Sequence, residues 1–106
     1  MRQEQVLEVK PIEFGISNTT GKEWRKRLLI TRTIEEYPVK HCFQVWEESA
    51  DTLTLVNVND ILAFKSREIS RESNGKWYTE MNAFGFMRLN PTTGVYEDIV
   101  APQQTV

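Results

Sequence analysis

An Asn-Gly pair between two strand-like runs constrains the fold of this chain most. Ser73-Asn74-Gly75-Lys76 separates residues 61–70 from residues 77–89, and both runs are rich in apolar, β-branched and aromatic side chains. Asn-Gly is the preferred sequence of the two-residue type I′ turn, whose twist matches that of the flanking strands. The second half of the chain is therefore predicted to form a long β-hairpin.

Three further strands are predicted in the first half, over residues 5–14, 24–34 and 39–47. Pro11 interrupts the alternation of the first one, because proline cannot donate a hydrogen bond to a neighbouring strand. Residues 48–59 are ambiguous, since Ser49 and Asp51 could cap a short helix. Five strands with a short helix between the third and the fourth is the order of an oligonucleotide/oligosaccharide-binding (OB) barrel. We expect an all-β domain over residues 4–89 and a C-terminal tail over 90–106, in which 96–100 could make one more short pairing.

The length of 106 residues allows one compact core, and 40% of the residues are apolar. No apolar run approaches the roughly 20 residues that span a bilayer. The polar N-terminus and the single cysteine, Cys42, indicate a cytoplasmic protein without a disulfide. Phe43, Phe64 and Phe86 are expected in the core. In the strand over 39–47, alternation places Phe43 and Val45 on one side and Trp46 on the other.

The sequence carries no recognisable catalytic motif. The segment from Gly15 to Lys22 differs from a phosphate-binding loop in its glycine spacing, and Glu23 stands where Ser or Thr would hold magnesium. His41 and Cys42 would point to opposite faces of a strand and could not act as a pair, so we expect a packed histidine and a small buried cysteine. We therefore expect neither enzymatic activity nor a metal or cofactor.

The net charge of −2 does not by itself announce a nucleic-acid partner, but the cations are clustered. One group lies within 22–32 and a second is formed by Lys65, Arg67, Arg71 and Lys76. These clusters could equally be solvated strand faces. Trp24, Trp46 and the pair Trp77-Tyr78 lie among or beside cations. Rings interleaved with cations are typical of single-strand binding, in which bases stack and phosphates are neutralised.

Several segments are similar to a small bacterial family that is known as a domain of unknown function and is related to single-stranded-DNA-binding proteins with an OB fold. The similar segments span about residues 7–89, and the most specific are Gly21-Lys22-Glu23-Trp24-Arg25-Lys26 and Asn74-Gly75-Lys76-Trp77-Tyr78-Thr79. The resemblance implies an OB fold, a single-stranded ligand and no catalytic residues. One departure is the C-terminal end, which lacks the acidic tail of ordinary single-stranded-DNA-binding proteins.

We predict a sequence-tolerant site for single-stranded DNA, or RNA, formed by Trp24, Arg25, Arg27, Trp46, Arg71, Trp77 and Tyr78. Trp77 could instead cap the barrel. A homodimer or homotetramer is expected, because an open barrel leaves strand edges free, and no membrane partner is expected. The alternative is an OB-fold protein-interaction or oligomerisation module without nucleic-acid binding, which the acidic isoelectric point of about 5.4 favours.

Overall fold

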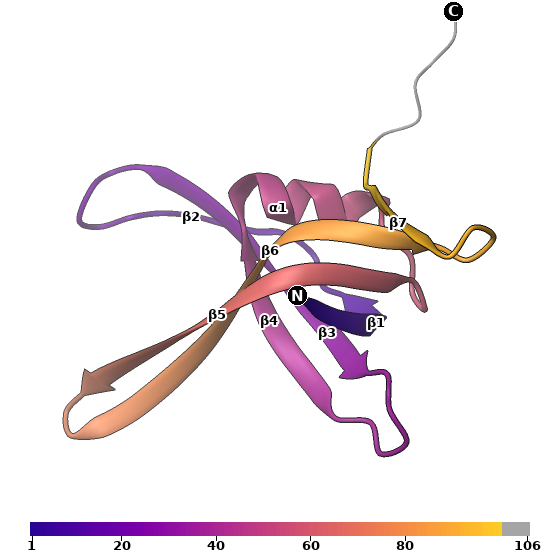
Figure 1. Ribbon diagram of the computed structural model, residues 1–106. Helices are drawn as coiled ribbons and strands as arrows, with labels where there is room; N and C mark the ends of the chain where they lie inside the picture. The colour runs from indigo at the N-terminus through magenta and orange to yellow at the C-terminus, as the bar shows by residue number, and fades with distance from the viewer. Residues whose placement is uncertain (101–106) are drawn as a thin grey trace, which may run out of the picture.

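The computed structural model describes residues 1–100, which are mostly β-strand (Figure 1). One short helix, α1 (Glu47–Thr52), is continued by a single 3₁₀ turn (Leu53–Leu55). None of the helical segments in this range is both long and apolar enough to cross a membrane. The strands are β1 (Arg2–Val9), β2 (Glu13–Ile16), β3 (Glu23–Thr33), β4 (Lys40–Trp46), β5 (Ile61–Ser73), β6 (Lys76–Asn90) and β7 (Val95–Asp98).

Five of the strands form a closed ring in the order β1, β5, β6, β4, β3 and back to β1. Every pairing in the ring is antiparallel except that of β4 with β6, which run parallel and pair at Gln44 and Asn82. The other two strands lie outside the ring, β2 against β3 and β7 against β6. The short helix lies between the third and fourth strands of the ring along the chain, as the sequence predicts.

The sequence predicts five strands, and the structure has seven. The expected first strand is divided into β1 and β2 by the segment around Pro11, which has no N–H to donate to the ladder. The seventh strand follows a turn in which the Gly94 N–H donates to the Asn90 carbonyl at 2.8 Å, and it supplies the extra pairing considered for 96–100. Ile99 then packs into the core. Residues 101–106 of the expected tail lie outside the described residues.

The core fills the interior of the ring. Phe43, Phe64 and Phe86 are buried there as predicted, and the rings of Phe43 and Phe64 meet edge to face at 5.1 Å between centroids. The prediction for Cys42 is wrong, because its side chain is exposed on the opposite side of β4 from Phe43. His41 is packed: its Nδ1 lies 2.7 Å from Oε1 of the buried Glu4, which also accepts a hydrogen bond from Thr31.

Two hairpin arms project from the ring on the same side (Figure 1). One is formed by β2 with the start of β3, and the other by the distal parts of β5 and β6. Asn74 and Gly75 at the tip of the second arm both have left-handed backbones, with φ of 52° and 78°, so the predicted hairpin turn is confirmed. Where this arm joins the ring, β6 carries one extra residue against β5, and Gly85 (φ 69°) provides the bulge.

Candidate nucleic-acid interface

The strands β3, β4, β5 and β6 share a side that faces away from the core, and directly paired residues place their side chains on the same side of a sheet. Register pairs Lys26 with Trp46, Gln44 with Asn82, and Asn82 with Arg67. We call this side the outer face and define it by Trp24, Lys26, Gln44, Trp46, Lys65, Arg67, Arg71, Tyr78, Asn82 and Phe84. It runs from one arm, across the ring, onto the other arm.

The centre of the outer face is a cluster of two tryptophans and a lysine. The Trp24 and Trp46 rings meet edge to face with centroids 5.9 Å apart. Lys26 is two residues from Trp24 on β3 and lies directly opposite Trp46 on β4. Its Nζ is 5.6 Å from the Trp24 centroid and 5.4 Å from that of Trp46. A cation at this distance is attracted by the negative faces of both rings. The cluster thus offers aromatic surface and positive charge in one place.

A residue of β6, the parallel neighbour of β4, fixes the orientation of the Trp46 side chain. Its Nε1–H donates to Oδ1 of Asn82 across the parallel pair. With its hydrogen-bonding edge engaged and 37% of the residue exposed, Trp46 keeps part of its ring open to solvent. Phe84, also exposed, extends the aromatic surface along β6.

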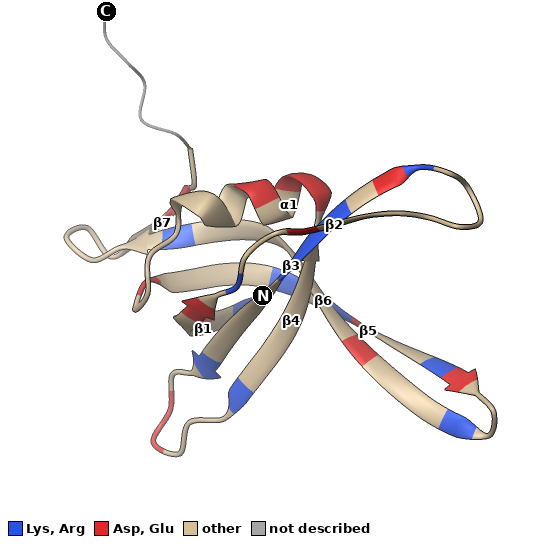
Figure 2. Cartoon of the chain, turned by 180° about the vertical axis from the view of Figure 1, so that it is seen from behind, with Lys and Arg blue, Asp and Glu red and all other residues tan. Residues whose placement is uncertain are grey.

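The β5–β6 arm carries a row of cations on the outer face. Lys65 is paired with Phe84, Arg67 with Asn82, and Arg71 with Tyr78. Within residues 1–100, neither these three cations nor Lys26 forms a salt bridge, whereas Arg2, Lys10, Arg25 and Arg88 do. Glu80 is the one carboxylate that β5 and β6 place on this side. Figure 2 shows the basic positions on the two arms.

Arg25 lies on the other side of β3, where it holds α1. Its Nε and Nη2 donate to the Asp51 carboxylate at 3.0 and 2.6 Å, and its Nη1 donates to Glu47 at 3.0 Å. The hydrogen bond from Arg25 lowers the pKa of Asp51, and the same contact raises the pKa of Arg25. The charge of Arg25 is therefore already balanced by Glu47 and Asp51 of α1, a helix whose acidic positions are red in Figure 2.

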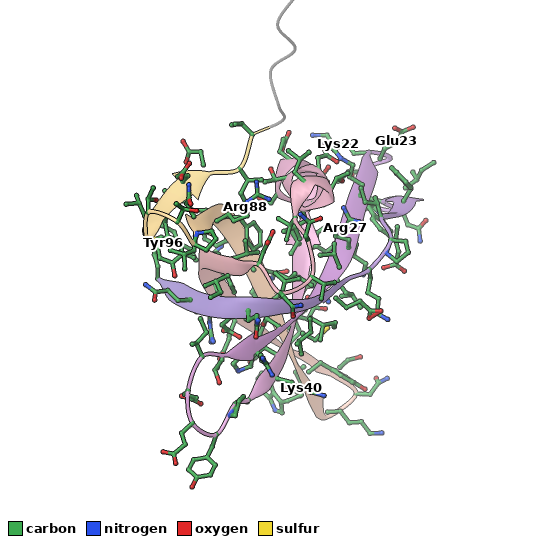
Figure 3. The ribbon with its side chains drawn as sticks, turned by 90° about the vertical axis from the view of Figure 1, so that its right-hand side faces the viewer. Lys22, Glu23, Arg27, Lys40, Arg88 and Tyr96 are labelled. Atoms are coloured by element: carbon green, nitrogen blue, oxygen red, sulfur yellow. The ribbon has the colours of Figure 1, made fainter. Side chains whose placement is uncertain are left out.

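Arg27 shares that side of β3, as the sequence predicts, and is only 9% exposed. Its guanidinium donates to the carbonyls of Lys10 and Ala50 and to Oγ1 of Thr54, at 2.9 to 3.0 Å. Burial lowers the pKa of Arg27. Figure 3 shows the side chain directed from β3 toward the helical segment. Arg27 joins the β1–β2 connection, α1 and the 3₁₀ turn, so its contacts are structural.

Trp77 points away from the outer face. It pairs with Glu72, one position out of phase with the Arg71–Tyr78 pair, and 68% of it is exposed. Its side of the arm carries Glu68 and Glu72 and no cation. Of the seven residues predicted for the site, the structure therefore brings four onto the outer face, namely Trp24, Trp46, Arg71 and Tyr78, and places Arg25, Arg27 and Trp77 elsewhere.

Six residues of the outer face are missing from the predicted site: Lys26, Gln44, Lys65, Arg67, Asn82 and Phe84. Lys26 was accessible to sequence reasoning, because residues two apart share a strand face and Lys26 is two residues from Trp24. Lys65 and Arg67 were accessible in the same way, because they are six and four residues from Arg71 and therefore share its face of the strand. Asn82 and Phe84 depend on the parallel pairing of β4 with β6 and on the bulge at Gly85, which no local pattern reveals.

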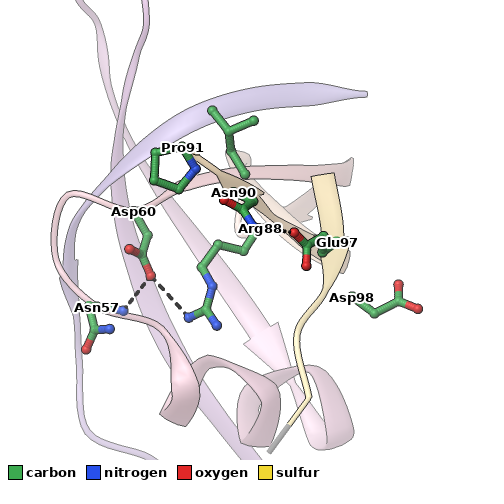
Figure 4. Close-up of a pocket in the computed structure, with 8 residues that line it drawn as sticks. Asn57, Asp60, Arg88, Asn90, Pro91, Glu97 and Asp98 are labelled. Carbon is green, nitrogen blue, oxygen red and sulfur yellow. Dashed lines mark hydrogen bonds and ion pairs between the residues drawn. The ribbon is translucent and has the colours of Figure 1, made fainter. Parts of the chain in front are cut away.

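A polar pocket of about 320 Å³ lies at the other end of the molecule, beside β7 (Figure 4). Its one cation, Arg88, donates to the Leu55 carbonyl at 2.8 Å and contacts Asp60 at 3.4 Å. Glu97 accepts a hydrogen bond from Asn90. The carboxylates outnumber the cation, so this pocket is unsuited to a polyanion. In the described part of the chain, no three His, Cys, Asp or Glu side chains are grouped to hold a metal ion.

Comparison with known proteins gives one match. No curated protein and no solved structure matches the chain. The model of a family described as a domain of unknown function, DUF3127, matches residues 3–86, which include both arms, all of β3, β4 and β5, β1 from Gln3 onward and β6 up to Phe86. Because the match covers well over half of the sequence, the chain belongs to the DUF3127 family.

Proposed function

We propose that this protein is an OB-fold domain that binds single-stranded DNA, without sequence preference, along the outer face. The observation that carries the proposal is the cluster of Trp24, Lys26 and Trp46, which lies next to a row of cations that make no salt bridge within residues 1–100. Rings on which bases can stack, beside cations free to meet phosphates, are what a sequence-tolerant single-strand site requires.

The strand order supports the OB assignment. Counted along the chain, the five strands of the ring are β1, β3, β4, β5 and β6, with the short helix after the third, as in OB barrels. OB barrels bind oligonucleotides on the face of their second and third strands, between the loop that joins the first two strands and the loop that joins the last two. The corresponding elements here are β3 and β4, the β2-containing arm and the β5–β6 arm.

In the proposed complex each group has one role. Bases stack on Trp24, Trp46 and, further along, Phe84 and Tyr78. Lys26, Lys65, Arg67 and Arg71 neutralise phosphates. The proposal assigns no catalytic residue and no cofactor, and Arg25, Arg27 and Trp77 take no part in contacting the strand.

The test is a titration of the protein with oligo-dT, followed by tryptophan fluorescence at several salt concentrations. Binding should quench emission, and the slope of log K against log salt should be about −3 if all four cations contact phosphates. Trp46→Ala should weaken binding by about 5- to 150-fold, the equivalent of 1–3 kcal/mol per stacked base. The matched control is Trp77→Ala. It removes another exposed tryptophan ring, from the side of the β5–β6 arm opposite to the outer face, and should leave affinity unchanged. Absence of binding at low salt refutes the proposal, and equal losses in both variants refute the assigned face.

The second candidate is a protein-interaction module. It is favoured by Trp77, Phe14 and Ile16, large apolar side chains that are exposed away from the outer face. Nothing in a single-strand site explains them. If oligo-dT does not bind while Trp77→Ala abolishes association with a protein partner, this candidate replaces the first.

A further inference from the structure

We infer that two copies of this chain pair through the free edges of their β2 strands and thereby join two outer faces into one continuous surface. The pairing itself is argued from β2 alone. Its consequence for single-strand binding rests on the proposed function.

The free edge of β2 presents unpaired backbone groups at defined positions. In the part of the chain that the structure describes, β2 pairs only with β3. The Ser17 N–H donates to the Lys22 carbonyl at 2.9 Å, which makes Ser17 and Lys22 a hydrogen-bonded pair in the register of β2 with β3. Backbone groups alternate in direction along a strand, so Gly15 also points toward β3. Phe14 and Ile16 therefore direct their N–H and C=O groups outward.

The same two residues are the most exposed apolar side chains of this arm, Phe14 at 75% and Ile16 at 65%. Being two apart, they share a face. If two β2 strands pair antiparallel about Gly15, Phe14 of each copy lies opposite Ile16 of the other. Four outward N–H and C=O pairs are then satisfied, and four apolar side chains gather on one side. The sequence of β2 is thus complementary to itself in one register.

The edge strand β7 offers a contrast. It carries Glu97 and Asp98, and self-pairing there would bring carboxylates together. By contrast, β2 has neither a lysine nor a proline, the usual protection of an exposed edge, and its one charge, Glu13, lies outside the Phe14–Ile16 segment. A second copy is therefore the occupant that the β2 edge fits.

Pairing about Gly15 would also organise the tryptophans. The Trp24 indole lies directly over Gly15, in the space that a Cβ would occupy. A two-fold axis normal to the sheet keeps the outer faces of both copies on the same side. Since opposite residues in a non-hydrogen-bonded pair are about 4.5 Å apart, the two Trp24 rings would lie side by side. One strand of DNA could then pass from one Trp24–Lys26–Trp46 cluster to the other.

A pair of four-residue strands buries less than the roughly 1,200 Å² of a stable complex, so the dimer should be weak on its own. We expect concentration-dependent dimers in sedimentation of the full chain at high micromolar to millimolar concentration, without nucleic acid. Ile16→Lys should weaken association by about tenfold or more, because it places a charge on the paired edge. Val95→Lys, which likewise replaces an exposed β-branched apolar residue by lysine but on the β7 edge, should have no effect.

The register is tested with cysteines in a Cys42→Ser background. Mixing Phe14→Cys chains with Ile16→Cys chains should give a disulfide-linked dimer under mild oxidation, because directly opposite Cα atoms lie within the 4.4–6.8 Å range of disulfides, whereas either variant alone should link poorly. A strictly monomeric protein, or association that Ile16→Lys leaves unchanged, overturns the inference even if oligo-dT binds. Dimers with the expected register but without oligo-dT binding support the inference and refute the proposed function.

Discussion

The Nε1–H of Trp46 donates to Oδ1 of Asn82 at 2.9 Å, across the point where β4 and β6 run parallel. This hydrogen bond fixes the orientation of a ring on the outer face from a strand that is distant in the sequence. Asn82→Ala should release the ring, alter tryptophan emission and weaken oligo-dT binding by about 2- to 10-fold, the range expected for one hydrogen bond.

Asn82→Asp is the informative companion variant. It keeps an acceptor for the indole, so the emission of the free protein should stay close to wild type. The added negative charge should weaken binding most at low salt. If Asn82→Ala changes neither emission nor affinity, Trp46 is held by other contacts.

Replacing Arg27 and Arg67 in turn distinguishes an arginine with structural contacts, Arg27, from one that is proposed to contact the ligand, Arg67. Arg27→Ala removes three hydrogen bonds from a buried cation and should lower the free energy of unfolding by about 2–4 kcal/mol, measured by urea denaturation. Arg67→Ala should leave that free energy within about 0.5 kcal/mol of wild type and reduce the salt slope of DNA binding by about 0.7. The reverse pattern would restore Arg27 to the site.

The ion pair of Arg25 with Asp51 predicts a pH dependence of stability. The pKa of Asp51 is lowered in the folded protein, so the pair contributes stability above the ordinary carboxyl pKa of about 4 and loses it as pH falls through the lowered value. Asp51→Asn should therefore destabilise the protein at neutral pH, and the difference from wild type should shrink below about pH 4. Glu72→Gln, at an exposed carboxylate without an ion pair among the described residues, should show no such trend.

Gly15 is required by the position of Trp24. A methyl group at residue 15 would overlap the indole, so Gly15→Ala should displace the ring, shift its emission and weaken oligo-dT binding. The unfolding free energy should change by less than about 1 kcal/mol, because both residues lie in an exposed arm. Glu13→Ala, on the same side of β2, should leave emission unaltered. Unchanged emission in Gly15→Ala would show that the ring can move without consequence.

The sequence predicted what short-range patterns encode. The Asn74-Gly75 turn, the alternation around Phe43 and the placement of Arg25 and Arg27 on the same face of one strand are local properties, and the structure confirms them. What those arginines meet was beyond local reasoning, because α1 folds back over β3 from 20 or more residues away. The division of the first strand at Pro11 was signalled, but its consequence, a separate β2 with its own free edge, was not drawn. Single-strand binding and the site remain predictions.

The bulge at Gly85 separates the core-bearing base of the β5–β6 hairpin from its arm, and the arm contributes nothing to the core beyond Met81 and Ala83. The length of the arm can therefore change without altering the core of the ring. Deleting two residues from each strand would shorten it by about 7 Å and preserve every remaining side chain's direction. Deleting one residue from each strand would exchange the two sides of the arm beyond the cut, so that Trp77 would lie on the outer face and Tyr78 on the opposite side. Related chains could therefore alter the span of their ligand in steps, while the ring that supports it stays the same.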